Sequence, residues 1–239
     1  VVKGRVVDSN EAPVPKPFMV LCGLVEGKNV CNNLKGESDG TFAYGGLKTG
    51  YDHLQVMTYQ AELATGQTYS GATLVVDVAS KDDVIDVGDI RIPIVTSLQE
   101  LDSSQGGTVA MHGLELEVAA GGLLFPSGED LGNVGIEDVP TGDMPFHSEG
   151  VYKAFAFYPF PGLLFPEGTL RIKLSEIAWA GSAPTGVTLL FNSLDDGGLT
   201  PIDFTMEDGV MITTLTDLTW IGLGDCGSFD VPEEQCVDL

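Results

Sequence analysis

Apolar residues along this chain alternate with polar ones or gather in runs of four to eight, separated by glycine, proline, asparagine and aspartate. This pattern is typical of β-strands, whereas the spacing of an amphipathic helix is nearly absent. The pattern in the first part of the chain predicts strands at 2–7, 18–24, 41–44, 53–58, 73–78 and 87–92. The sequence therefore predicts an all-β fold of the sandwich or barrel type.

The length of 239 residues suits two domains better than one small sandwich. Alternation stops at 94–107, where small polar residues accumulate. We therefore predict two consecutive β-sandwich domains, residues 1–93 and 108–239, with 94–107 as an exposed linker that proteases cut first.

Five short segments in a fixed order give residues 1–93 a family resemblance. They read GRVVD from Gly4, APV from Ala12, SDGTF from Ser38, LKTGY from Leu47 and VGDIRI from Val87. Together they resemble the carboxypeptidase regulatory-like domain. The resemblance implies a transthyretin-like sandwich without catalytic residues of its own. Two features depart from the family pattern, namely a cysteine pair at 22 and 31 and a polar stretch at 60–71. These departures concern the lengths of the loops rather than the fold.

The second part of the chain contains one motif twice. GLLFPSG from Gly122 and GLLFPEG from Gly162 lie 40 residues apart and differ at one position. Repeat folds need at least three copies to bury a core, so we interpret the pair as a shared structural turn. With GGTV from Gly106, LELEV from Leu114 and TLRIKL from Thr169, these motifs resemble the ZU5-like β modules, over about residues 105–222. That resemblance implies an interaction domain with no active site.

Four cysteines form two short-range pairs. Cys22 and Cys31 flank a predicted two-residue turn at 26–27, which would place them opposite each other on paired strands. Directly opposed Cβ atoms lie about 4.5 to 5.5 Å apart, close enough for a bridge after small adjustment. Cys226 and Cys236 close a loop of similar length. We expect two disulfides in an exported protein, extracellular or on the cell surface. For Cys22 and Cys31 the alternative is two free buried cysteines.

The charge is strongly negative and unevenly distributed. The chain has 35 acidic and 11 basic residues, a net charge of −24. Residues 1–93 contribute 12 acidic and 8 basic residues, and 94–239 contribute 23 and 3. A negative field of this kind repels nucleic acids and anionic lipids. The sequence has no run of 18 apolar residues, so it predicts no helix that spans a membrane. The chain begins without an initiator methionine, so we expect a processed product or one segment of a longer secreted chain.

Calcium is the cofactor that this charge pattern favours, because hard cations take carboxylate and carbonyl oxygens. Carboxylates gather in three predicted loop regions, and none has the order of an EF-hand loop. The first region holds Glu129, Asp130, Asn133, Glu137 and Asp138. The candidate ligands in the other two are Asp195, Asp196, Asp203, Asp225, Asp230 and Glu233, with Glu207, Asp208 and Glu234 beside them. A solvated acidic face that promotes solubility is the alternative for each region.

Motifs for catalysis are missing from the sequence. No G-x-S-x-G, H-E-x-x-H, C-x-x-C or phosphate-binding glycine loop occurs. His53, His112 and His147 are the only histidines, and we interpret each as a surface or locally hydrogen-bonded residue. We therefore expect no enzymatic activity and no cofactor other than calcium.

Aromatic residues concentrate at 152–165, within a predicted strand. Strand side chains alternate, so Phe155 and Phe157 face one way while Tyr152, Tyr158 and Phe160 face the other. We expect both faces to be core, because small alanines lie between the aromatics. A platform for sugars or protein partners is the alternative.

The sequence thus predicts a non-enzymatic structural or interaction module of a secreted or cell-surface protein. We expect protein partners or self-assembly, through an edge offered by strand 2–7. The alternative is a calcium- or carbohydrate-binding accessory module of an extracellular hydrolase.

Overall fold

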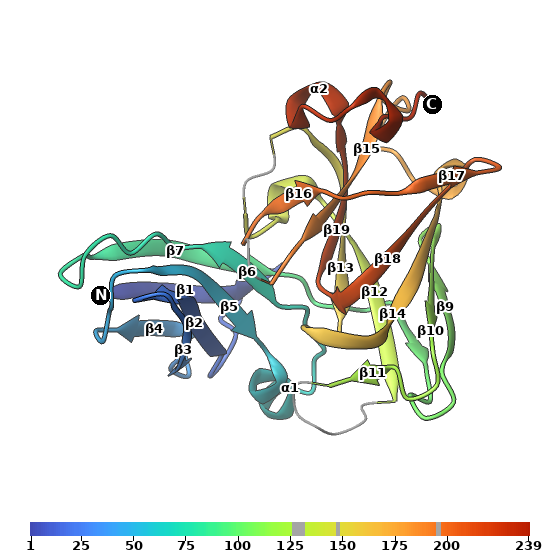
Figure 1. The fold of residues 1–239 in the computed structure, drawn as a ribbon. Coiled ribbons are helices and arrows are strands. Elements are labelled where there is room, and N and C mark those ends of the chain that lie inside the picture. Colours follow the sequence, from blue (N-terminus) through green and yellow to red (C-terminus); the bar gives the residue numbers. More distant parts are fainter. Residues whose placement is uncertain (126–131, 147–148, 195–196) are drawn as a thin grey trace.

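A computed structural model describes residues 1–125, 132–146, 149–194 and 197–239 (Figure 1). It confirms an all-β protein built as two β-sandwich units. The described part of the chain holds no helix long and apolar enough to cross a bilayer.

Two sheets form the first unit and share one apolar core. The four-stranded sheet has the order β3-β2-β5-β6 and the three-stranded sheet the order β4-β1-β7. Their strands are β1 Val2–Asp8, β2 Phe18–Val25, β3 Lys28–Lys35, β4 Thr41–Tyr44, β5 Tyr51–Met57, β6 Ala72–Val75 and β7 Ile85–Ile92. Val6 and Ile90 from one sheet meet Leu21, Leu54 and Val56 from the other in this core.

Strand β1 is the centre of its sheet, so the expectation of a free edge at residues 2–7 is wrong. It pairs with β4 on one side in antiparallel fashion and with β7 on the other in parallel fashion. The parallel partner comes from about 80 residues further along the chain. Local sequence cannot reveal such a partner, and the strand has no unpaired edge to offer a neighbouring chain.

The hairpin β2–β3 forms as the sequence predicts. Glu26 and Gly27 adopt φ values of 51° and 74°, the left-handed pair that a two-residue turn of this type needs. Cys22 consequently lies directly opposite Cys31.

A short helix, α1 (Tyr59–Thr65), occupies part of the stretch expected to be a polar loop. Gly66 ends it in the left-handed conformation, and its amide donates to the carbonyl of Glu62.

Among the described residues, two six-stranded sheets form the second unit. One has the order β17-β18-β14-β10-β9, with β11 also paired to β14, and the other has the order β16-β15-β19-β13-β12-β8. Their strands are β8 Leu98–Glu100, β9 Gly107–Met111, β10 Leu114–Val118, β11 Leu123–Leu124, β12 Asn133–Val139, β13 Val151–Tyr158, β14 Gly162–Lys173, β15 Val187–Asn192, β16 Leu199–Pro201, β17 Thr205–Glu207, β18 Val210–Leu218 and β19 Trp220–Asp225. Three 3-10 turns, Thr141–Asp143, Leu174–Glu176 and Glu233–Gln235, and helix α2 (Cys226–Phe229) complete the unit.

Strand β13 is buried on both faces, as the alternation of its aromatics predicts. Phe155 and Phe157 enter the core between the two sheets. Ala154 and Ala156 face the opposite side, where they join a second cluster with Trp220. The aromatic residues of the segment 152–165 are therefore core, apart from Tyr152 and Phe165, which are exposed.

The first unit contacts that opposite side around Ser70 and Gly71, so the two units meet in a buried junction (Figure 1). The Trp220 indole N–H donates to the carbonyl of Gly71 at 2.8 Å. The Ser70 hydroxyl donates to the carbonyl of Phe157, also at 2.8 Å. Gly71 leaves no room for a side chain, because an added Cβ would lie 2.1 Å from the carbonyl oxygen of Val56.

The segment 94–107, expected to be an exposed linker, is partly built into the second unit. Leu98–Glu100 forms β8 and pairs with β12. The amide of Thr96 donates to the Glu137 carboxylate at 2.7 Å, and Leu101 is buried in the core. The polar composition of this segment predicts a loop. The strand was missed because three residues are too few to show an alternating pattern.

Candidate functional site

The repeated GLLFP motif forms an exposed apolar surface, because its two copies pair with each other. Leu124 lies opposite Leu163 and Leu123 opposite Leu164 in the antiparallel pair of β11 and β14. The amide of Phe165 extends the pairing by donating to the carbonyl of Gly122 at 2.8 Å.

Alternation along the two strands divides their leucines between core and solvent. Leu123 and Leu164 enter the core of the second unit. The outer face carries Leu124, Leu163 and Phe165, exposed by 53%, 46% and 79%. We call these three residues the apolar patch. Single exposed apolar residues are ordinary, but several large ones side by side indicate a contact surface.

A bulge helps expose the aromatic ring of the patch. Strands β14 and β18 pair at Leu163 and resume only at Gly168. The intervening residues therefore lack regular partners on β18. Bulges commonly redirect side chains at the edges of sheets.

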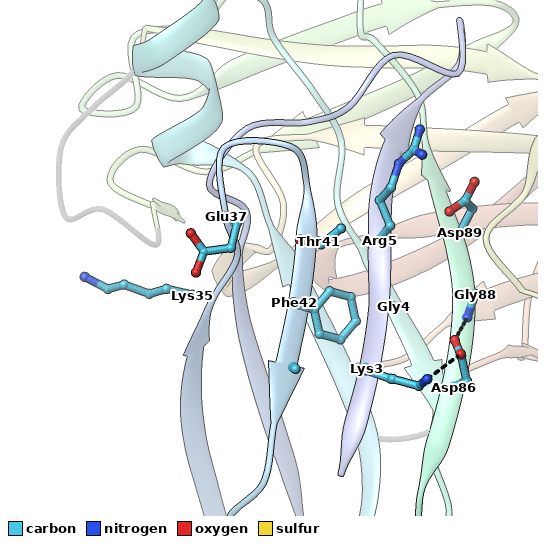
Figure 2. Close-up of a pocket in the computed structure, with 11 residues that line it drawn as sticks. Lys3, Gly4, Arg5, Lys35, Glu37, Thr41, Phe42, Asp86, Gly88 and Asp89 are labelled. Carbon is cyan, nitrogen blue, oxygen red and sulfur yellow. Dashed lines mark hydrogen bonds and ion pairs between the residues drawn. The ribbon is translucent and has the colours of Figure 1, made fainter.

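A second surface feature is an open, polar groove on β1, β4 and β7, with a volume of about 510 Å³. Figure 2 shows Lys3 ion-paired with Asp86 at 3.2 Å, while Asp86 also accepts from the amide of Gly88 at 3.0 Å. Arg5 lies in register with Asp89 on the neighbouring strand. The groove lining holds no histidine, serine or cysteine.

The predicted calcium ligands are not brought together in the described part of the chain. No group of three or more histidine, cysteine, aspartate or glutamate side chains lies close enough there to hold a metal ion. Asp225 instead caps helix α2, accepting from the amide and hydroxyl of Ser228 at 2.8 Å each and from the Tyr152 hydroxyl at 2.9 Å. These hydrogen bonds, from Ser228 first and then Tyr152, lower the pKa of Asp225.

The other predicted ligands are scattered. Asp203 uses its carbonyl to accept from Thr213, Asp230 follows α2 in a left-handed conformation, and Glu233 begins a 3-10 turn. Asp195 and Asp196 lie outside the described residues, as do Glu129 and Asp130. Calcium binding stays a prediction.

The carboxylates of β12 have structural partners. Glu137 accepts from the amides of Thr96 and Ser97, and Asp138 is ion-paired with Lys153 at 2.6 Å.

Both expected disulfides are present. Cys22 is bonded to Cys31 and Cys226 to Cys236, with Cα separations of 4.1 and 5.8 Å. No cysteine is left free. Two disulfides indicate an oxidising environment.

Two of the three histidines lie among the described residues. His53 is buried in β5 and contacts the carboxylate of Asp52. His112, in a turn, lies 3.1 Å from the hydroxyl of Ser97. His147 lies outside the described residues.

A partly buried carboxyl at the junction is a feature that the sequence did not reveal. Glu62 on α1 accepts from the amide of Tyr69 at 3.2 Å and from the hydroxyl of Tyr158 on β13. Burial raises the pKa of Glu62 to about 7, against the opposing effect of these hydrogen bonds. Burial, followed by the proximity of Glu62, also raises the pKa of Tyr158 and keeps its hydroxyl a donor.

Comparisons with known proteins give no family. No family model matches the chain, and no curated protein matches it. One solved structure with some likeness is a 9R-lipoxygenase from Cyanothece PCC8801, with 12% identity and a TM-score of 0.26 over 40% of this chain and 17% of that one. Another is a variant of BcpA, the major pilin subunit of Bacillus cereus, with 11% identity and a TM-score of 0.26 over 93% of this chain and 56% of that one. The chain thus spans about half the length of the pilin subunit. Neither likeness is close enough to bear on function.

Proposed function

We propose that this chain is a non-enzymatic structural and interaction module of a secreted or cell-surface protein, and that it acts in protein assembly or adhesion. The observation that carries the proposal is the apolar patch on β11 and β14. The two disulfides support an exported location, because such bonds persist in oxidising compartments.

The patch offers part of the energy that a specific contact needs. Burying a leucine or phenylalanine side chain completely contributes about 1.5 to 3 kcal/mol. Since roughly half or more of each patch residue is exposed, covering all three yields about 3 to 5 kcal/mol before the entropic cost of association. Such a contact serves as the centre of an interface when polar contacts surround it.

The buried junction suits a module that presents this surface in a fixed orientation. Hydrogen bonds from Trp220 and Ser70 cross it, and both donors are fully buried. A partner held at the patch is then positioned relative to the whole body, because movement of one unit against the other breaks buried hydrogen bonds.

Site-specific photo-cross-linking tests the proposal. A benzophenone amino acid replaces Phe165 in the full chain, which is displayed on its native surface. The matched control carries the same group at Val84, which is 69% exposed and belongs to the first unit. We expect a discrete cross-linked product from position 165 only, and we expect Leu163→Ser in the same chain to reduce it. Equal products from both positions, or none from position 165, contradict the proposed function.

A further inference from the structure

The apolar patch belongs to a unit without available positive charge. Residues 94–239 contain 23 acidic and only 3 basic residues, and all three basic residues are described. Lys153 is ion-paired with Asp138 at 2.6 Å, and Arg171 with Glu117 at 3.0 Å. The third, Lys173, lies 3.6 Å from Glu176 and 3.9 Å from Glu115.

Acidic groups also lie close to the patch itself. Glu167 follows Phe165 by two residues on β14 and is exposed. The end of β10 that carries Glu117 lies beside Gly168, because the Glu117 carbonyl oxygen is 3.1 Å from the point where a Gly168 Cβ would be. The Glu117 side chain is 56% exposed even though it contacts Arg171.

We propose that the occupant of the apolar patch is another protein that presents lysine or arginine side chains around an apolar centre. This inference rests on the proposed function and adds the chemical class of the partner. Charges within about 8 Å of each other still interact at physiological ionic strength. A partner with basic residues around its apolar centre is therefore attracted to this surface, whereas a partner with acidic residues there is repelled. The apolar centre supplies affinity, and the surrounding charges select the partner.

A second copy of the chain fits this surface poorly. Each copy carries a net charge of −24, and even the first unit, residues 1–93, is negative at −4. Whichever unit of a second copy approached the patch would bring more charge of the same sign. Long-range repulsion therefore opposes self-association through this surface.

Defined peptides test the class of partner. The probe is a fluorescein-labelled peptide of alternating lysine and leucine, and its counterpart has glutamate in place of lysine. Binding to the full chain is followed by fluorescence anisotropy at low and physiological salt. We expect the lysine peptide to bind, and Phe165→Ser to weaken that binding about tenfold, since a large apolar contact is lost. We expect Val84→Ser, the control at an exposed valine of the first unit, to leave it unchanged.

Added salt should weaken binding of the lysine peptide, and the glutamate peptide should not bind. Equal binding of both peptides, or equal affinity of Phe165→Ser and the wild type, overturns the inference. So does a dimer in light scattering that Phe165→Ser converts to a monomer, because the occupant would then be a second copy.

The cross-linking experiment separates this inference from the proposed function. A partner cross-linked at position 165 that contacts it through an acidic surface overturns the basic partner and leaves the interaction module standing. Absence of any product at position 165 removes both.

Discussion

Replacing Glu62 with glutamine tests the partly buried carboxyl between the two units. In the folded chain this group accepts hydrogen bonds from Tyr69 and Tyr158 but has lost much of its contact with water. Glutamine keeps the size of the side chain and an acceptor oxygen, and it removes the negative charge. The variant therefore isolates the cost of burying a carboxylate.

The size of the effect follows from linkage. The pKa of Glu62 rises from 4.5 to about 7 on folding, a change of about 2.5 units, and each unit corresponds to about 1.4 kcal/mol. A raised folded pKa means that the folded state binds the proton more tightly than the unfolded state. The stability from the neutral carboxyl is thus fully present below pH 4.5 and is lost as pH rises through 7. The total loss is about 3 kcal/mol.

Urea unfolding at pH 4.5 and pH 8 measures this loss, with tryptophan fluorescence as the signal. We expect the free energy of unfolding of the wild type to fall between the two pH values by about 3 kcal/mol more than that of Glu62→Gln. Glu167→Gln is the matched control, because Glu167 is exposed and its replacement should leave the pH dependence unchanged. The same pH dependence in the wild type and in Glu62→Gln refutes the reasoning.

Three further predictions concern covalent bonds, calcium and strand order. The intact mass should lie about 4 Da below the reduced mass, two hydrogens for each disulfide, and free thiols in denaturant would contradict both bridges. If the acidic loops bind calcium, the melting temperature should rise with a stabilisation of about 2.7 kcal/mol at 100 times Kd. Equal shifts in sodium chloride of matched ionic strength would instead indicate screening. Deleting residues 1–7 should unfold the first unit, because β1 lies between β4 and β7, and an unchanged β-sheet signal in circular dichroism would contradict this.

Local patterns were sufficient to predict the β2–β3 hairpin and the burial of β13 on both faces. Glu26 and Gly27 determine the turn that places Cys22 opposite Cys31, so the register follows from ten consecutive residues. The alternation of Phe155 and Phe157 with alanines likewise predicts two buried faces.

Features that depend on residues far apart in the sequence could not be predicted from such local patterns. The central place of β1 depends on β7, and the apolar patch depends on the pairing of two motifs that were interpreted as a shared structural turn. The burial of Glu62 requires a seven-residue helix to meet β13, and a helix this short has no recognisable period in the sequence.

The parallel pairing of β1 with β7 has a mechanical consequence. The chain enters the first unit along β1 and leaves it along β7, and both strands run in the same direction. A tension applied between Val1 and Pro93 therefore pulls the two strands past each other along their length. The hydrogen bonds between them are spaced evenly along the strands, so they share the load rather than yield one after another. The first unit is thus arranged to withstand stretching along the chain.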